Sequence, residues 1–298
     1  LINAVDMPAR QSFVVELVQD RKDLSNAIAL NSSIFNAARL VGPSVAGFML
    51  EITSAGVCFL LNAASYIAVI WALLVMRITR TVSAPTRAGG LQALREGLSY
   101  ALGFRTIAYL LLNLSLVSIA GTPYMTLMPV FAKKVLHGGP QALGLLIAGV
   151  GVGAMVGAFF LASRRNAMGL PKLMAAAMAL YSLSLLAFSH SRWLPLSVGI
   201  MLFTGLGMML MMAGTNTLLQ TLVSEDKRGR VMSLYAMAFM GSGPIGSLWA
   251  GAAATHIGAP LTVYFGSLAC LVATAIFIRR LPITLREAAP ALSRQAAG

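Results

Sequence analysis

Long apolar segments recur along this chain, and they constrain its fold more than any other feature. Each is long enough for an α-helix to cross the hydrocarbon core of a bilayer, which takes roughly 20 residues. Only 10% of the residues are charged, whereas a soluble domain carries about 25%. The sequence predicts an all-α polytopic membrane protein with eight full transmembrane helices, and residues 1–16 are expected to end a further helix. The predicted spans are 26–50, 56–76, 106–132, 141–163, 169–189, 193–222, 231–254 and 260–279.

Basic residues gather in alternate loops. The loops on one side hold 18 of the 22 Lys and Arg residues, and those on the other side hold only Lys133, Lys134 and Arg192. Cytoplasmic loops of membrane proteins carry this excess of positive charge. We therefore expect the linker and the C-terminus to be cytoplasmic, in a multi-pass protein of the cell (inner) membrane. The formal net charge of +13 then needs no nucleic-acid partner.

An internal repeat predicts how the chain is divided. Leu17–Lys22 resembles Leu222–Lys227, and Gly42-Pro43 reappears as Gly243-Pro244. Parallel repeats of six spans are one way in which large transporters are built. The predicted parts are 1–78, the end of a first half; 79–105, a cytoplasmic linker with an amphipathic helix; 106–280, a second half; and 281–298, a cytoplasmic tail. By the same alignment, about 100 residues are expected to precede Leu1.

The residues around Gly42-Pro43 carry a family resemblance. The pattern Ala38-x-x-x-Gly42-Pro43-x-x-Ala46-Gly47 resembles the fifth-span antiporter motif of the major facilitator superfamily, with Ala for Gly at two positions. Three further stretches are similar to the branch that includes the enterobactin exporter and the transmembrane secretion effector group: Asp6-Met7-Pro8-Ala9-Arg10-Gln11, Asn26-Ala27 and Asn36-x-x-Arg39. The resemblance covers the end of span 4 through span 12. It implies an inner-membrane exporter whose substrate path lies between two six-helix halves.

Span 26–50 carries a permanent charge near its middle. Arg39 lies three residues after Asn36, so the two share a helix face, and Asn31 precedes them on the same span. An intramembrane charge is costly and by default marks a functional site. In the repeat these positions align with methionines, whereas Gly-Pro is kept. We therefore assign the polar face to a substrate path; a structural hydrogen bond between helices is the alternative. The residues assigned to the scaffold are Gly42, Pro43, Gly47, Gly243 and Pro244.

Span 106–132 contains Gly121, Pro123 and Pro129, which predict a broken helix lining a cavity. A proline kink that only serves packing is the alternative. Asn113 and Tyr124 on this span are the other predicted residues of the substrate path. The cytoplasmic gate loops are expected to use Arg10, Arg164, Arg165, Arg228 and Arg230.

Several patterns argue against other kinds of site. The glycines at 149, 151, 153 and 157 follow no strand and precede no Lys-Ser/Thr, which favours close helix packing over nucleotide binding. The methionines at 208, 209, 211 and 212 favour packing or lipid contact over an adaptable binding surface. No catalytic constellation is visible, and the three histidines are scattered. We therefore expect no enzyme, no cofactor and no metal site.

These patterns together predict a secondary active transporter that exports a small organic molecule, such as a drug, a siderophore or a metabolite, by alternating access. An ion gradient, of protons by preference, is the expected energy source. No Asp or Glu lies in the middle of a predicted span, so the coupling acid is expected in the segment before Leu1. An uptake permease of the same fold and a non-transporting membrane scaffold or sensor are the alternatives.

Overall fold

The computed structural model describes residues 49, 53–75, 90–163 and 169–296. Its contacts divide the chain into two compact units, Leu1–Arg87 and Ala88–Gly298, and each is described by itself. Apart from residue 49, the predicted span 26–50 lies outside the described residues. So do the site residues predicted within it and the loop residues Arg10, Arg164 and Arg165.

The first unit contributes one described helix, α3 (Ala55–Val75). It matches the predicted span 56–76. Large apolar side chains such as Phe59, Trp71 and Leu74 are exposed along it. A helix that is apolar on all sides is typical of a membrane span.

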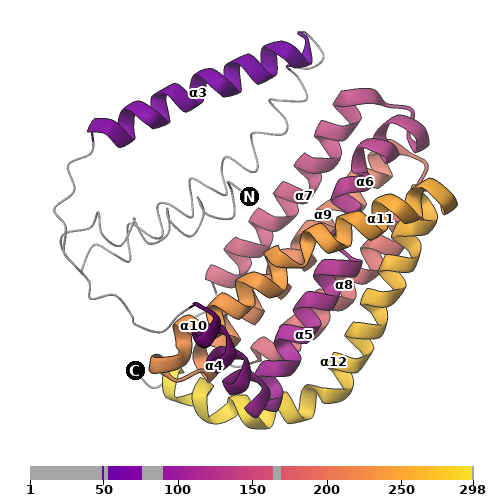
Figure 1. Cartoon of the computed structure of the whole chain (residues 1–298). Coiled ribbons are helices and arrows are strands. Elements are labelled where there is room, and N and C mark those ends of the chain that lie inside the picture. Colours follow the sequence, from indigo (N-terminus) through magenta and orange to yellow (C-terminus); the bar gives the residue numbers. More distant parts are fainter. Residues whose placement is uncertain (1–48, 50–52, 76–89, 164–168, 297–298) are drawn as a thin grey trace. The chain divides into compact units, whose positions relative to one another are not determined.

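The second unit is a bundle of antiparallel membrane-length helices (Figure 1). Its elements are α4 (Gly90–Gly103), α5 (Arg105–Ala120), α6 (Tyr124–Val130), the π-helix η1 (Phe131–Val135), α7 (Gly139–Ala162), α8 (Leu170–His190), α9 (Leu194–Leu222), α10 (Glu225–Ala236), the π-helix η2 (Met237–Gly241), α11 (Gly243–Ile257) and α12 (Ala259–Ala296). No strand occurs in the described residues. With α3, seven stretches of the described chain are long and apolar enough to cross a membrane. The all-α membrane class is confirmed.

One boundary differs from the sequence interpretation. The last helix, α12, does not stop near residue 279 but continues through Arg279, Arg280 and Pro282 to Ala296. The polar stretch before α5 contains helix α4, as its amphipathic pattern predicted. Figure 1 shows α4 at the end of the bundle where α5 and α10 begin and where α12 ends.

Prolines mark where several helices begin. Pro140, Pro171, Pro195 and Pro260 each stand in the first turn of α7, α8, α9 and α12. A first-turn residue has no helical partner for its N–H, so proline loses nothing there. Because the loops between consecutive helices are short, neighbouring helices run antiparallel.

Glycines bring α7 and α9 into close contact. A Cβ on Gly153 would lie 1.8 Å from the carbonyl oxygen of Leu202, and one on Gly205 would lie 2.0 Å from that of Val150. Only a residue without a side chain fits at such a distance between backbones. Close helix packing, predicted for this glycine series, is therefore confirmed at Gly153.

The interior of the bundle is filled by aromatic residues and methionines. The rings of Phe131 and Phe188 stack with their centroids 4.5 Å apart. Met208 and Met211 are buried in the same core. The structure therefore gives these two methionines the packing role that the sequence favoured.

Candidate functional site

The first span of the second unit is interrupted between α5 and α6. Pro123 has no N–H, so the carbonyl of Ile119 four residues earlier loses its helical donor. The amides of Gly121 and Thr122 both bond to the carbonyl of Val117, at 2.8 and 3.3 Å. The indole N–H of Trp249 on α11 donates to the carbonyl of Ile119 at 2.7 Å. The interruption predicted in this span is confirmed, and a side chain from another span satisfies the freed carbonyl; that the stretch lines a cavity stays a prediction.

The span containing Gly243-Pro244 is interrupted in a similar way. The chain widens into the π-helix η2 just before Gly243, and Pro244 then occupies the first turn of α11. Hydroxyl groups satisfy carbonyls in this segment: Ser118 on α5 donates to Phe239 at 2.7 Å, and Ser242 donates to Ala238. Breaks in membrane helices are tolerated where neighbouring side chains replace the lost bonds.

The two interrupted segments pack directly against each other. A Cβ on Gly246 would lie 2.7 Å from the carbonyl oxygen of Ile119, so the backbones approach closely there. The hydroxyls of Thr126 and Ser247 lie 3.0 Å apart across the same contact. Both breaks therefore lie in one region shared by α5, α6, η2 and α11.

Asn113 and Tyr124, which the sequence assigned to the substrate path, lie inside the helix contacts of this unit. Asn113 is buried, and its Nδ2 donates to the carbonyl of Ala273 on α12 at 3.3 Å. The Tyr124 ring is 1% exposed and meets that of Tyr181 edge-on, with centroids 6.4 Å apart. The structure does not bring the two side chains together in one cavity. Their part in a substrate path stays a prediction.

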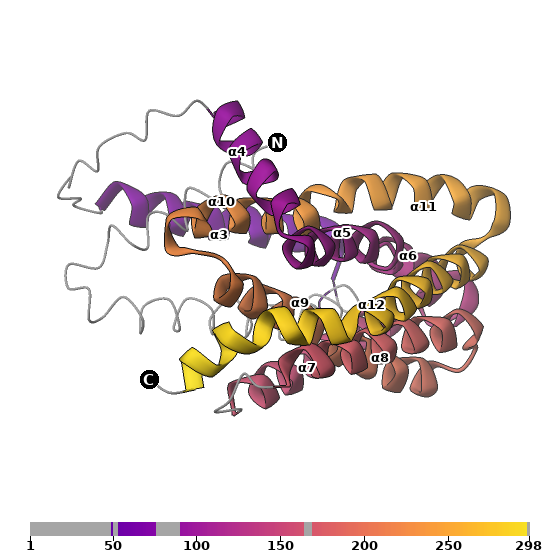
Figure 2. The same cartoon turned by 90° about the horizontal axis from the view of Figure 1, so that it is seen from below.

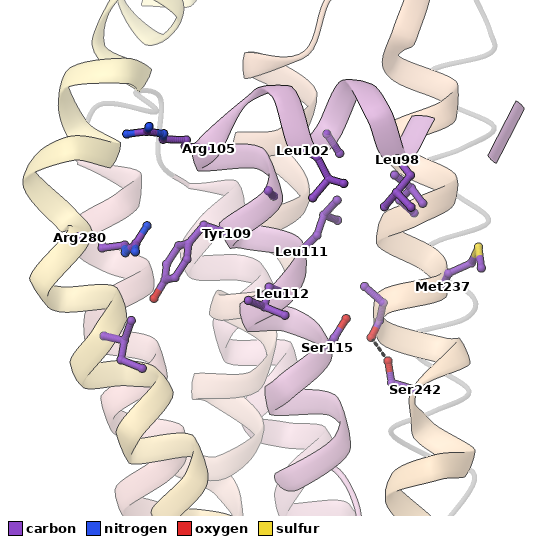
Figure 3. A pocket seen from close by; sticks show the side chains of 15 residues that line it. Leu98, Leu102, Arg105, Tyr109, Leu111, Leu112, Ser115, Met237, Ser242 and Arg280 are labelled. Atoms are coloured by element: carbon purple, nitrogen blue, oxygen red, sulfur yellow. Dashed lines mark hydrogen bonds between the residues drawn. The ribbon is translucent and has the colours of Figure 1, made fainter. Parts of the chain in front are cut away.

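A cavity of about 950 Å³ opens between α4, α5, the α10–η2 segment and α12. Most of its wall is aliphatic, with Leu98, Leu102, Leu112, Met237 and Ile276 among the lining residues. Figure 3 shows the guanidinium groups of Arg105 and Arg280 at one end of this wall, with the Tyr109 ring beside them. The cavity is therefore amphipathic, apolar along most of its surface and cationic at one end.

The cationic end is held by stacked rings. The guanidinium carbon of Arg280 lies 4.9 Å from the ring centroid of Tyr109, within cation–π distance. That ring in turn stacks on Phe277, with centroids 6.4 Å apart. Arg105 begins α5 one turn before Tyr109, so the two side chains share a helix face. Neither guanidinium forms an ion pair with a carboxylate of the described residues; the nearby Glu287 accepts a hydrogen bond from Thr106.

Helix α4 is fastened to α10 beside this cavity. A nitrogen of Arg230 lies 2.7 Å from a carboxylate oxygen of Glu96. The hydroxyls of Tyr100 and Ser224 are 3.4 Å apart. Arg228 and Arg230, expected in a loop, belong to helix α10, and the Arg228 side chain lies outside the described part. Figure 2 shows α4 and α10 from below the bundle.

The grouping of Arg105, Tyr109 and Arg280 was missed from the sequence. Both arginines were counted only as markers of topology. The spacing of Arg105 and Tyr109 could have indicated that these two side chains lie together, because residues four apart share a helix face. Their meeting with Arg280 depends on the packing of α12 on α5, which no local pattern reveals.

Comparison with known proteins agrees with this architecture. The chain is 26% identical over 292 residues to the staphyloferrin A transporter of Staphylococcus aureus (strain NCTC 8325 / PS 47), covering 96% of this chain and 72% of that one. It is 25% identical over 263 residues to the multidrug efflux pump Tap of Mycolicibacterium fortuitum, covering 87% of this chain and 64% of the pump.

A solved structure shares the fold. It is that of a bacterial homologue of the human lysosomal transporter Spinster in an inward-facing and unoccupied conformation, with a TM-score of 0.58 and 16% identity over 97% of this chain and 75% of that one. Residues 1–296 match the family described as transmembrane secretion effector. The chain therefore belongs to the transmembrane secretion effector family, a family of transporters of the major facilitator superfamily.

Proposed function

We propose that this protein exports a small organic molecule across the cell membrane by alternating access, driven by an ion gradient. Transport itself follows from the family; the direction, the energy source and the kind of cargo are the proposal. The observation that carries it is the contact between the two interrupted spans, α5–α6 and η2–α11, through Trp249 and Ile119. Many transporters form their substrate path from discontinuous helices that meet between the moving parts of the protein.

The direction is supported by the comparisons. The matched family is described as a secretion effector, and one relative is a multidrug efflux pump. The proposed cargo is an organic molecule, in line with the names of the two relatives, a staphyloferrin A transporter and a multidrug efflux pump. It is a drug, a siderophore or another small metabolite.

The driving force is proposed to be the proton gradient. Among the described residues, the acidic ones lie at or beyond the ends of the apolar stretches, as Glu96 and Glu287 do. We place the coupling acid outside the described residues. Arg39, outside the described residues, is the proposed partner of that acid or of an anionic group on the cargo, because guanidinium keeps its charge inside the membrane.

The proposal is tested with fluorescent amphipathic dyes in energised cells. Cells that produce the full-length protein should retain less dye than cells with an empty vector, and an uncoupler should remove the difference. A panel of anionic, neutral and cationic dyes defines the cargo class. Greater retention in the producing cells would indicate uptake, and equal retention across the panel would favour a scaffold or sensor.

Orientation is proposed from the distribution of basic residues. The end of the bundle that carries α4, Arg105 and Arg280 is assigned to the cytoplasm, and the end with Lys133 and Lys134 to the outside. Single cysteines at Ser83 and Lys134, in a background without Cys58 and Cys270, provide the test. An impermeant reagent applied to intact cells should label position 134 and spare position 83. The opposite labelling would reverse the orientation.

A further inference from the structure

We propose that the cavity between α4, α5, η2 and α12 binds an anionic phospholipid. In this site the phosphate lies against Arg105 and Arg280, and an acyl chain lies along the aliphatic wall. The inference does not depend on the direction or the energy source of transport.

The position of the cavity is the first argument. It lies at the end of the bundle where α5 begins and α4 crosses; Arg105 begins one membrane-length stretch, and Arg280 lies in the last two turns of another, Ala259–Glu287. Side chains near the ends of membrane-spanning helices lie at the depth of the lipid headgroups. Basic pockets between transmembrane helices on the cytoplasmic side are recognised sites for anionic headgroups.

Charge is the second argument. Two guanidinium groups lie at this end of the cavity, and neither forms an ion pair with a carboxylate among the described residues. The described residue Glu287 lies near this end but bonds to the hydroxyl of Thr106. The start of α5 adds to the positive field, because its N-cap residue Phe104 provides no side-chain cap for the first amides.

The apolar wall is the third argument. The side chains of Leu102, Leu112 and Met237 are 65, 66 and 53% exposed, although they line a concave surface. At membrane depth this wall suits a hydrocarbon chain, whereas a free phosphate has no apolar part to lie along it. A phospholipid supplies both the anionic head and the chain that the two ends of the cavity require.

Lipid retention on the purified full-length protein tests the proposal. Native mass spectrometry counts the lipids kept after titration with phosphatidylglycerol or phosphatidylcholine of the same acyl chains. The wild-type protein should keep phosphatidylglycerol in preference. The double variant Arg105→Gln/Arg280→Gln should bind it roughly 30-fold more weakly, about 2 kcal/mol for two basic groups near the surface.

Two variants separate this site from general charge attraction. Arg279→Gln changes the same charge beside Arg280 at a residue that does not line the cavity, and it should bind like wild type. Ala108→Trp fills the cavity without changing its charge, and it should also lose the lipid. Thermal unfolding of each variant in detergent identifies any that fails to fold, and the other variants then decide the question.

Three results would overturn the proposal. One is equal retention of the two lipids by the wild-type protein. Another is a loss with Arg279→Gln as large as that of the double variant. The third is binding of glycerol phosphate, which has no acyl chain, as tight as that of phosphatidylglycerol. The proposal is supported if Ala108→Trp loses the lipid while Arg279→Gln retains as much phosphatidylglycerol as the wild-type protein.

Discussion

The indole N–H of Trp249 donates a 2.7 Å hydrogen bond to the carbonyl of Ile119, the carbonyl that Pro123 leaves without a helical donor. Two interrupted spans are thereby joined, one interrupted at residues 121–123 and the other at residues 237–242. The bond explains how a break in α5–α6 is tolerated inside a membrane.

Replacing Trp249 with Phe keeps the ring and removes the donor. The carbonyl of Ile119 then lacks its partner, and we expect a loss of about 1 kcal/mol of stability. Thermal unfolding in detergent measures this as a lower midpoint. Trp193→Phe is the control, because Trp193 is 65% exposed at the start of α9, and it should leave the midpoint unchanged. An unchanged midpoint for Trp249→Phe would mean that water or another donor replaces the bond.

Replacing Pro123 with Ala returns an N–H to the break. The restored amide competes with Trp249 for the carbonyl of Ile119 and favours a continuous helix. We expect equal or higher thermal stability and a severalfold fall in transport rate. Pro195→Ala is the matched control, because a first-turn proline gives up no helical bond. Transport by Pro123→Ala at the wild-type rate would assign the break to packing alone.

Replacing Gly153 with Ala tests the contact between α7 and α9. The new Cβ would lie 1.8 Å from the carbonyl oxygen of Leu202, so the helices must separate. We expect a loss of roughly 1–3 kcal/mol, the usual cost of overpacking. Gly199→Ala on α9 meets nothing within 4 Å and should be neutral or slightly stabilising. Similar midpoints for both variants would contradict the close contact.

Local sequence patterns were enough for the described spans and for the interruption at residues 121–123, whereas the π-helix η2 was not predicted. Apolar length predicts where a helix crosses, and the prolines at 123 and 244 predict a missing amide wherever the helix lies. The partners of the freed carbonyls could not be predicted, because Trp249 and Ile119 are brought together only by packing of α11 on α5. Tyr124 shows the same limit. It was assigned to the substrate path from its place on the interrupted span, and the packing of its ring edge-on against Tyr181 inside the bundle could not be predicted from local pattern.

The charge at Arg39 leads to a prediction for a part of the chain outside the described residues. Arg39→Met copies the residue aligned in the second half and removes an intramembrane charge, whose burial is costly. We expect equal or higher thermal stability and little transport. Arg39→Lys keeps the charge but loses the planar fork of donors, so it should fold and transport weakly. If instead stability and transport fall in proportion, Arg39 has a structural role; full transport by Arg39→Met excludes a role in the path.

Movement of a dye into sealed inside-out membrane vesicles tests the central claim most directly. The vesicles contain the full-length protein, and their interior is made acidic so that the proton gradient has the direction found across the cell membrane. An exporter driven by protons should accumulate an amphipathic dye inside these vesicles and release it when an ionophore collapses the gradient. Accumulation only in right-side-out vesicles, or no accumulation of any dye class in either orientation, would contradict the account.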